Sequence, residues 1–535
     1  MNHLFPRNEN CEKPEVVERL VRLRDKTQTL INSFFILVFM ADEKPIKDEN
    51  TLMKERKHKL SLIKDTGVNP YPYSFDKKDN SCDLHKKYDK KLKAHDITKD
   101  KAKIAGRVRT LRIMGKASFV DIEDESGKIQ LYVQVDNVKN YKLLKKLDIG
   151  DWIGCEGTIF KTKTNELTIE VKKLDILCKA MRPMPSNWYG LKDPEIRYRK
   201  RELDLIMNKD VLNDFKIRSQ AVKYLREYLD KHDFLEVETP ALQPVYGGAN
   251  ARPFITKLNA LDMTVFLSIS PELYLKRLLV GGFERVYTYC KNFRNEGVDK
   301  SHNPEFSMME CYAAYWDYND MMKFTEEMYE YIVKKITGDT KVKYEDKTID
   351  FKAPWAKITM YDLVKKFTKI NVEKLNKEEI LAEVAKKKLK IDYDEKWPKG
   401  LIVTALYDEY CEHELVQPTH VIDHPKETSP LCKIHRDNPE LIERFEPVCS
   451  GMELGNAYSE LNDPAIQRKH FKEQLKMLKK KGDPHPLDEG YVEALEAGMP
   501  PAAGLGIGFD RLVMFLTNSH SIRDVILFPF MKKLD

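Results

Sequence analysis

The sequence lacks the cysteine patterns that mark disulfide scaffolds and zinc knuckles. Its 535 residues include nine cysteines, an odd number at irregular spacing, and none of them forms a C-x-x-C pair. Disulfide frameworks use even, regularly spaced cysteines, and structural zinc sites use closely paired ones. We therefore interpret the cysteines as reduced thiols, and we expect the protein in a reducing compartment, the cytoplasm.

The sequence also lacks an apolar run long enough to cross a membrane. Its membrane-like feature is Phe34 to Met40, whereas a span needs about 20 apolar residues. Mixed charge precedes this run instead of a short basic segment, which argues against a signal peptide. We expect no membrane partner and a poorly structured or helical extension over residues 1–60. We also hypothesise that translation starts at Met40, which N-terminal peptide mass spectrometry would refute by finding peptides from upstream of it.

There is no strong excess of one charge. Lys and Arg number 91 against 85 Asp and Glu, so the formal net charge is +6. This mild excess permits contact with a polyanion but does not require it. At 42% hydrophobic residues the chain can bury large cores, and its length favours two or more domains.

Two common nucleotide-binding patterns are missing. The chain contains neither a G-x-x-x-x-G-K-[ST] loop nor a strand-associated G-x-G-x-x-G, which argues against P-loop and Rossmann sites. Gly504 to Arg511 has glycines at intervals but ends in arginine. Glycines there would let a helix approach a sheet or ligand closely, and alone they assign no function.

Residues 41–100 are rich in lysine, with charge runs at Lys54 to Lys59 and Lys86 to Lys91. We predict an exposed helical lead-in, and a weak, non-specific grip on RNA phosphates is the alternative. From Ile104 the pattern changes to short β-runs. Ser118 to Ile122 and the alternating run Ile129 to Val135 flank a turn and predict a hairpin.

Further strands are expected around Trp152 to Phe160 and Leu167 to Val171. About five strands with small turns favour a Greek-key barrel of the oligonucleotide-binding (OB) type, although other all-β modules share this pattern. After a linker with Pro183, Pro185 and Trp188, a larger α+β body begins. There we predict a helix that ends near Asp233, then a strand Phe234 to Thr239 ended by Pro240.

Three segments become specific when they are read together. They are Phe234 to Pro240, Phe293-Arg294-Asn295-Glu296 continuing through His302 to Phe306, and Gly508-Phe509-Asp510-Arg511. In order and character they resemble motifs 1, 2 and 3 of the class II aminoacyl-tRNA synthetases. The H-I-G-H and K-M-S-K-S signatures of the other synthetase class are missing.

Three further sequence segments resemble the lysine-specific members of this class. They are Pro271 to Tyr274, Gly281 to Val286 and Asn456 to Asp463. The resemblance extends from about residue 60 to the end of the sequence. Two segments resemble the eukaryotic cytosolic branch of the family. They are residues His420 to Glu446 and the Asn-Ala-Tyr sequence that begins at Asn456.

The resemblance implies an architecture of two domains. An OB-fold anticodon-binding domain would span residues 61–185, and a catalytic domain over 186–535 would contain a six- or seven-stranded antiparallel sheet flanked by helices. Motif 1 would lie near 213–240, motif 2 near 293–318 and motif 3 near 504–515. The motif 1 helix and strand form the subunit interface in the family, so a homodimer is implied.

The resemblance also implies the reaction: lysine and ATP form lysyl-adenylate, and the lysine then passes to the terminal ribose of tRNA(Lys). A carboxylate must attack a phosphate, so fixed positive charge is needed where two anions meet. Arg294 would clamp the α-phosphate and the amino-acid carboxylate, Arg511 would bind the γ-phosphate, and Phe306 would stack on adenine. The residues carried over as catalytic or ATP-binding are Arg294, Asn295, Glu296, His302, Asn303, Phe306, Glu453, Leu454, Gly508, Phe509, Asp510 and Arg511. Glu446 and Glu453 resemble the family's ligands for Mg²⁺, an ion that prefers hard carboxylate oxygens.

A lysine pocket needs acceptors for two ammonium groups. By resemblance, Glu272 and the backbone of Gly248 hold the α-amine, and Glu310 assists. Glu460 and Tyr312 receive the ε-ammonium, and Asn456 and Tyr458 shape the walls. A buried carboxylate left without its cation is costly, so ligands that lack the amine are rejected.

The barrel would read the anticodon of the tRNA. Phe119 offers a stacking face, Arg112 and Gln130 offer hydrogen-bonding groups, and Glu166 can accept from a base. The alternative is an ordinary barrel surface with one exposed phenylalanine.

Three residues depart from the family pattern: Tyr246, Ser268 and Trp316. They affect the expected pocket shape rather than the reaction class. Two rival functions stay open, a relative that lysylates a protein and a catalytically silent RNA-binding scaffold. The barrel argues against the first, and the intact Arg294, Glu453, Glu460 and Arg511 argue against the second.

Overall fold

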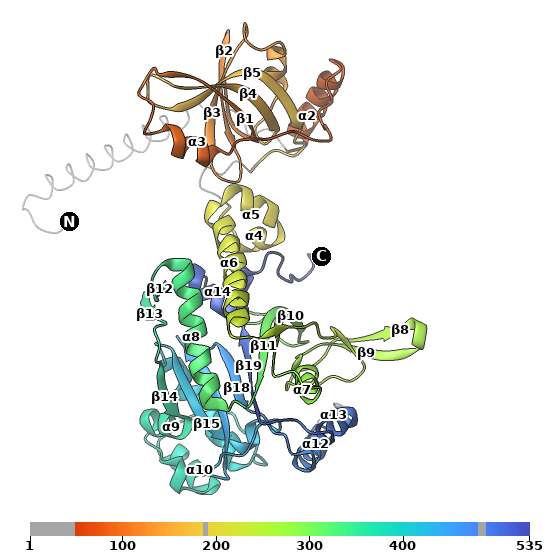
Figure 1. Cartoon of the computed structure of the whole chain (residues 1–535), viewed down its shortest axis with the longest axis vertical. Coiled ribbons are helices and arrows are strands. Elements are labelled where there is room, and N and C mark those ends of the chain that lie inside the picture. Colours follow the sequence, from red (N-terminus) through yellow and green to blue (C-terminus); the bar gives the residue numbers. More distant parts are fainter. Residues whose placement is uncertain (1–48, 186–190, 480–487, 535) are drawn as a thin grey trace, which may run out of the picture. The chain divides into compact units, whose positions relative to one another are not determined.

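The computed structural model describes residues 49–185, 191–479 and 488–534 (Figure 1). The run Phe34 to Met40 and the proposed start at Met40 lie outside the described residues. The chain divides into two compact units, residues 1–186 and 187–535, each of which is described by itself.

The first unit contains a closed barrel of five strands. Their order around the barrel is β1-β2-β3-β5-β4. The strands are β1 (Ile97–Met114), β2 (Ala117–Glu123), β3 (Lys128–Gln134), β4 (Trp152–Lys161) and β5 (Leu167–Cys178). This confirms the predicted barrel, although β1 is much longer than the short strands that we expected.

The predicted hairpin is formed by β2 and β3, which pair antiparallel from Ala117 with Gln134 to Glu123 with Lys128. Its turn is fixed by Asp124, whose Oδ1 accepts from the backbone N of Ser126 at 2.9 Å and of Gly127 at 3.0 Å. Alternate residues of both strands, such as Val120 and Leu131, are fully buried in the barrel core.

Among the residues that the structure describes, two α-helices accompany the barrel, α2 (Glu49–Lys64) and α3 (Ser81–Tyr88). The lysine-rich segment is helical as predicted, but it is not simply an exposed lead-in. Arg56 is buried and donates to the carbonyl oxygens of Ala180 and Ile149, each at 2.9 Å. A basic residue inside a charge run therefore anchors the helix within the first unit.

The second unit is a mixed sheet surrounded by helices. Its helices are α4 (Pro194–Arg199), α5 (Arg201–Met207), α6 (Lys209–Lys231), α7 (Glu272–Val280), α8 (Tyr318–Thr337), α9 (Met360–Thr368), α10 (Lys377–Lys386), α11 (Lys399–Tyr410), α12 (Pro464–Lys479), α13 (Glu489–Glu496), α14 (Phe509–Thr517) and α15 (Ile522–Val525). Its strands are β6 (Leu235–Glu236), β7 (Leu242–Gln243), β8 (Ile255–Leu258), β9 (Met263–Leu267), β10 (Arg285–Phe293), β11 (Glu305–Ala314), β12 (Lys341–Tyr344), β13 (Lys347–Asp350), β14 (Ala356–Thr359), β15 (Thr419–Pro425), β16 (Leu441–Cys449), β17 (Met452–Glu453), β18 (Gly455–Ser459) and β19 (Ala502–Gly508).

The main sheet has the strand order β14-β15-β16-β18-β19-β11-β10-β6, with β17 paired to β16. It has nine strands within the described residues, not the six or seven that we expected. It is also not fully antiparallel, because the edge pairs β14–β15 and β10–β6 are parallel. The additional strands include β6 and β17, which have two residues each and therefore show no periodicity in the sequence. The predicted strand Phe234 to Thr239 is thus mostly irregular backbone.

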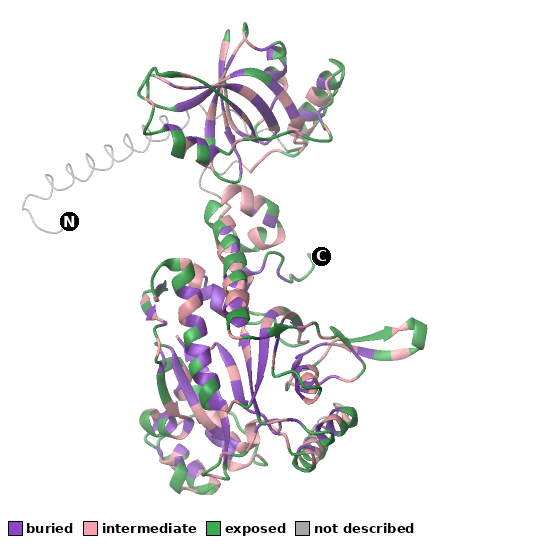
Figure 2. Ribbon diagram, in the orientation of Figure 1, coloured by how far each residue is buried: buried purple, intermediate pink, exposed green. Residues whose placement is uncertain are grey.

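The two faces of the sheet have different environments. On β11, Met309, Cys311 and Ala313 belong to the large core that also contains residues of α6, α8 and α14. Figure 2 shows buried residues along the central strands of the sheet and along α8. Because successive side chains of a strand alternate in direction, the residues between these three face the other way. They line the cavity described below.

Within the part of the chain that the structure describes, no helix is both long enough and apolar enough to traverse a lipid bilayer.

Candidate active site

A cavity of about 450 Å³ lies against the open face of the main sheet. Most of the residues expected at an active site line it. They are Gly248, Glu272, Arg294, Glu296, His302, Asn303, Phe306, Glu310, Tyr312, Glu446, Glu453, Leu454, Asn456, Tyr458, Gly508, Asp510 and Arg511. These residues come from distant parts of the chain, so the fold has gathered them.

Three expected residues do not line this cavity: Asn295, Phe509 and Glu460. Asn295 donates its backbone N to the carbonyl of Arg252 at 2.8 Å, and Phe509 is fully buried against Tyr289. Phe509 is therefore a core residue that holds the start of α14. Glu460 lies just behind the cavity wall.

Glycines form the floor of the cavity. Gly504 pairs with Tyr312 of β11 and with Tyr458 of β18, and Gly506 pairs with Glu310 and Asn456 in the same two strands. A Cβ atom on Gly504 would overlap the Glu460 carboxylate and the Tyr312 ring. The period-two glycines of β19 thus leave bare backbone between two rows of functional side chains.

Three carboxylates gather at one end of the cavity, Glu272, Glu310 and Glu460. Glu272 accepts from the Tyr458 hydroxyl at 2.5 Å, and Glu310 accepts from the Tyr312 hydroxyl at 3.0 Å and from Ser270 at 2.8 Å. All three carboxylate side chains are buried. This acidic end suits a ligand that carries ammonium groups.

Burial, followed by the neighbouring charge of Glu272, raises the pKa of Glu310 to about 8, although hydrogen bonds from Ser270 and Tyr312 oppose the shift. Burial also raises the pKa of Glu460 well above its ordinary value, opposed by Lys276. Near pH 7 the Glu310 carboxyl is therefore mostly protonated while the cavity holds no cation.

Two arginines lie toward the other end. The Arg294 guanidinium stands 5.1 Å from the centre of the Phe306 ring. Burial lowers the pKa of Arg294, but the ordinary pKa of an arginine is so high that the group stays charged. Arg511, in the first turn of α14, donates to the backbone carbonyl of Glu453. The arrangement can hold an anion between two fixed cations.

Asp510 lines the cavity and also holds this end of it together. Its side chain is buried, accepts from the backbone N of Ser307 at 2.8 Å and pairs with Arg218 at 2.5 Å. These contacts join α14 to β11 and α6, which fixes the direction of the neighbouring Arg511.

Glu446 and Glu453 form an acidic pair on adjoining strands. Burial raises the pKa of Glu453, and the charge of Glu446 adds to the shift. Arg444 donates to Glu446 at 2.5 Å and to the side-chain oxygen of Asn456 at 3.0 Å. The described residues include no cluster of three or more metal-ligating side chains. An ion held by this pair would need further ligands from water or phosphate.

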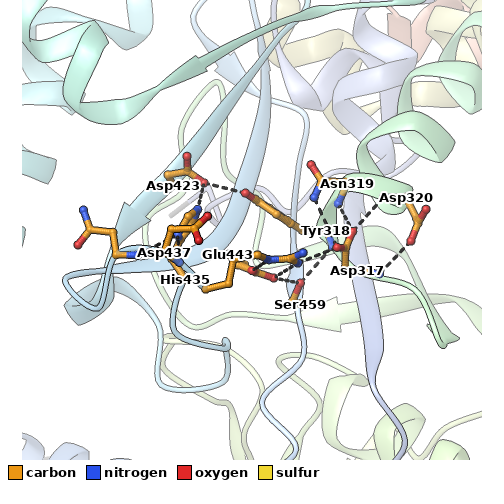
Figure 3. A network of polar contacts seen from close by, with 11 residues as sticks. Asp317, Tyr318, Asn319, Asp320, Asp423, His435, Asp437, Glu443 and Ser459 are labelled. Atoms are coloured by element: carbon orange, nitrogen blue, oxygen red, sulfur yellow. Dashed lines mark hydrogen bonds and ion pairs between the residues drawn. The ribbon is translucent and has the colours of Figure 1, made fainter.

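A polar network lies on the opposite side of β18 (Figure 3). Ser459 donates to Glu443 at 2.6 Å and accepts from the backbone N of Tyr318 at 3.1 Å. Arg436 links Glu443 to Asp317, with a contact of 2.7 Å to the latter. Because neighbouring residues of a strand face opposite ways, fixing Ser459 on this side fixes Glu460 on the cavity side.

In the first unit, the residues expected to read an anticodon share one outer face of the barrel. The Arg112 guanidinium stands 6.0 Å from the centre of the Phe119 ring, and Gln130 accepts from Thr168 at 3.1 Å. Phe119 also contacts Tyr132, with ring centres 5.0 Å apart. Glu166 is exposed on the turn between β4 and β5.

Two family models match the chain. Residues 193–532 match tRNA synthetases class II (D, K and N), and residues 102–177 match the OB-fold nucleic acid binding domain. The chain belongs to the class II tRNA synthetases.

Relatives of this class II synthetase are named lysine–tRNA ligases. One from Clostridium novyi (strain NT) is 50% identical over 489 residues, which cover 90% of this chain and 95% of the relative. One from Clostridium tetani (strain Massachusetts / E88) is 47% identical over 504 residues, covering 92% and 99%. These relatives are bacterial. They therefore give no support to the prediction, made from His420 to Glu446 and the Asn-Ala-Tyr sequence, that the chain belongs to the eukaryotic cytosolic branch.

The residues that depart from the family pattern occupy different places in this synthetase. Tyr246 lines the cavity. Ser268 lies behind it, where it accepts from Gln243 and donates to Asn292. Trp316 packs in the core against Phe324, away from the cavity. Of the three, Tyr246 is therefore the one placed to alter the shape of the pocket.

Sequence reasoning missed several residues of the synthetase site. Lys276 and Gly504 meet Glu460, and Tyr132 extends the aromatic face of the barrel. The signals were present, because Lys276 follows Glu272 by one helical turn and Tyr132 is an outward position of an alternating strand. Neither signal predicts which distant residue Lys276 or Tyr132 will contact.

We predict that an ammonium ligand expels the proton of Glu310. A nearby cation favours the ionised carboxyl, so binding at pH 7 should release protons, and the release should shrink as the pH rises above 8. Calorimetry of lysine binding in buffers of different ionisation enthalpy measures this release. Glu310→Gln should abolish that component, and an equal release from Glu310→Gln would contradict the assignment.

Proposed function

We propose that the protein is a lysine–tRNA ligase. It activates L-lysine with ATP to lysyl-adenylate and pyrophosphate, then transfers the lysine to the terminal ribose of tRNA(Lys). The observation that carries this proposal is the cavity itself, which is lined by the buried carboxylates Glu272 and Glu310 and by the arginines Arg294 and Arg511. The extent of the similarity to lysine–tRNA ligases supports the same conclusion.

The arginine end serves the activation step. Arg294 binds the α-phosphate and the lysine carboxylate, which lowers the repulsion between the two anions as they approach. Arg511 holds the γ-phosphate, and Phe306 offers its ring to adenine. Glu296, His302 and Asn303 line the same region and contact adenosine or phosphate groups.

We also propose that Glu446 and Glu453 hold Mg²⁺. The residues fit the ion, because their oxygens are hard ligands and the charge of Glu446 raises the pKa of the buried Glu453, although Arg444 and Arg511 already pair with the two carboxylates. When bound, Mg²⁺ neutralises part of the triphosphate charge.

The acidic end selects lysine. Glu272 and Gly248 hold the α-amine, Glu310 assists, and the charge of Glu460 with the hydroxyl of Tyr312 attracts the ε-ammonium. An aspartate side chain would face these carboxylates and be repelled. Aspartate matters here because the matched family model covers enzymes of the D, K and N types.

The deciding experiment is ATP–pyrophosphate exchange by the full-length protein with lysine, aspartate and asparagine in turn. Exchange that depends on lysine and not on the other two is expected. Charging of tRNA(Lys) transcripts, with and without a changed anticodon, then separates a tRNA ligase from an enzyme that lysylates a protein. A protein that shows no exchange with any amino acid would refute the proposal.

We expect Phe119→Ala to weaken tRNA charging while leaving amino-acid activation intact. Stacking of one base on an aromatic ring contributes about 1–3 kcal/mol, so the KM for tRNA should rise roughly 5- to 160-fold. Tyr88→Phe is a control in the same unit, since Tyr88 is buried and its hydroxyl donates to Asp100 rather than to a neighbour of Phe119. Steady-state charging against tRNA concentration measures the effect, and equal KM values for Phe119→Ala and wild type would remove Phe119 from the interface.

We further propose a homodimer acting in the cytoplasm. Leu527, Phe528 and Phe530 near the C-terminus are 42%, 74% and 64% exposed, and adjacent apolar side chains of this size mark an association surface. The double change Phe528→Asp and Phe530→Asp should convert a dimer to a monomer, as measured by light scattering after size-exclusion chromatography. A wild-type monomer, or a dimer unaffected by both changes, would contradict this part.

A further inference from the structure

A buried lysine stands between two of the pocket carboxylates. Lys276 lies on α7 and is fully buried, and its Nζ bonds to Glu272 Oε1 at 2.7 Å and contacts Glu460 Oε2. The same ammonium stands 5.4 Å from the centre of the Tyr458 ring. Lys276 itself does not line the cavity, so it acts from behind the wall that the ligand touches.

We propose that Lys276 is a built-in counter-cation that orients Glu272 and favours the ionised form of Glu460, leaving this end of the pocket short of positive charge. The inference rests on the proposed function, because the missing charge is the one that the ammonium groups of lysine supply. Lys276 is thus a positioning residue that acts through the two carboxylates.

The charge balance supports this role. Once the ligand has ionised Glu310, three carboxylates and one ammonium give a net charge of minus two, which the α- and ε-ammonium groups of lysine neutralise. Without Lys276, two buried carboxylates would face each other, and at least one would take up a proton instead of staying charged. A neutral carboxyl attracts an incoming ammonium far more weakly than a carboxylate does.

The geometry keeps Lys276 in place when the ligand enters. Lys276 and Glu272 are one turn apart on α7, so their contact is built into the helix. Burial alone lowers the pKa of Lys276, but Glu272 and Glu460 outweigh it and hold that pKa well above its ordinary value. Moving the Lys276 ammonium away would leave a buried charge without its partners, which is costly. Lys276 is therefore a fixed part of the site and does not compete with the ligand for the carboxylates.

Glu460 keeps acceptor capacity for a ligand. Neither of its carboxylate oxygens accepts a hydrogen bond from the described residues, although Oε2 is in contact with Lys276. A buried carboxylate with open acceptor sites is costly unless a donor arrives. Gly504 lines the cavity and has no side chain at this point, so the Glu460 carboxylate occupies the space that a Cβ atom of residue 504 would take.

The titratable groups that surround Lys276 come from several elements. They are Glu272 and Arg277 on α7, Glu310 and Tyr312 on β11, Cys432 before β16, Tyr458 on β18, Glu460 just after it, and Tyr491 on α13. Tyr312 and Tyr458 have pKa values raised well above their ordinary value by burial and then by Glu272, so both stay protonated over the working range. The carboxyls are therefore the groups that would respond to loss of Lys276.

The test is Lys276→Met, which keeps the length of the side chain and removes its charge. In ATP–pyrophosphate exchange at pH 7 we expect the KM for lysine to rise at least tenfold while the KM for ATP stays within about twofold. Between pH 7 and pH 9 the lysine KM of the variant should fall toward that of wild type, because the carboxyls ionise again while the substrate ammonium stays charged.

A matched control is Lys179→Met in the barrel unit. Lys179 is also fully buried, and its Nζ contacts Asp148 at 2.5 Å and Asp151 at 2.9 Å. Both variants should lower the temperature of unfolding, but Lys179→Met should leave the lysine KM unchanged at every pH. If Lys276→Met does not fold, Lys276→Gln with the same pH series provides the measurement.

The outcomes separate this inference from the proposed function. A wild-type protein without lysine-dependent exchange refutes the proposed function. A wild type that exchanges, with a Lys276→Met variant whose lysine KM is equal to or below the wild-type value, overturns the inference alone. A raised KM that does not change with pH overturns it too, since simple loss of packing has that signature.

Discussion

Replacing Arg294 with alanine should lower the kcat of lysine-dependent ATP–pyrophosphate exchange about 100- to 1000-fold. Arg294 follows β10, its guanidinium is largely buried, and its nearest acidic neighbours in the cavity are Glu453 and Glu310. Removal of one preorganised donor from a developing anion typically costs about 2.7–4 kcal/mol of transition-state stabilisation. The effect should fall on kcat more than on the lysine KM, because the charge that Arg294 balances is greatest in the transition state.

Two further variants give this prediction its controls. Arg294→Lys keeps a charge but cannot bind two oxygens with a planar fork, so it should recover only part of the lost rate. Arg226→Ala removes an exposed arginine that pairs with Glu236, and it should exchange at the wild-type rate. If Arg294→Ala stays within threefold of wild type, Arg294 does not clamp the reacting phosphate.

The glycine floor of the cavity could be predicted from the sequence only in part. The glycines of Gly504 to Gly508 recur at every second position, which is the period of a strand and leaves one face without side chains. Their partners, Tyr312 on one side and Tyr458 on the other, are set by long-range pairing. No local pattern specifies such pairing, so the resemblance to a family was needed to bring these residues together.

The motif residue Phe509 does not line the cavity, and the reason is physical. Phe509 and Asp510 belong to a motif next to a ligand, yet a motif also contains the residues that hold its own backbone in place. Phe509 is in the core, and Asp510 pairs with Arg218. Among neighbouring motif residues, burial separates those that support the site from those that contact a ligand. Burial becomes known only when the whole fold is known.

The role of Glu460 separates two ways in which a site can select lysine. The sequence assigned it direct contact with the ε-ammonium. The structure places it on the cavity side of the sheet but outside the cavity lining, in contact with Lys276, with oxygens that are still able to accept. The sequence and the structure agree that Glu460 contributes charge at this end of the pocket. They differ on whether Glu460 contacts the ε-ammonium directly. If the charge of Glu460 selects the substrate, its neutral isostere must fail even though the shape of the pocket is kept.

Glu460→Gln should therefore raise the KM for lysine about 100-fold or more while leaving ATP affinity nearly intact. Loss of one charge from a buried charge pair typically costs about 2–5 kcal/mol, and here the pocket would have no net charge left to attract an ammonium. Lysine titrations in ATP–pyrophosphate exchange, with ATP binding measured separately by calorimetry, give the two numbers.

The control for Glu460→Gln is Glu326→Gln, a change at a buried glutamate of the same unit that accepts from the backbone N of Trp355 at 2.9 Å and lies outside the cavity. Both variants remove one buried negative charge, so both should shift the unfolding temperature, but only Glu460→Gln should change the lysine KM. Unchanged lysine-dependent exchange in Glu460→Gln would mean that selection rests on Glu272 and Glu310 alone. Equal losses in the two variants would mean that stability, rather than substrate charge, had been altered.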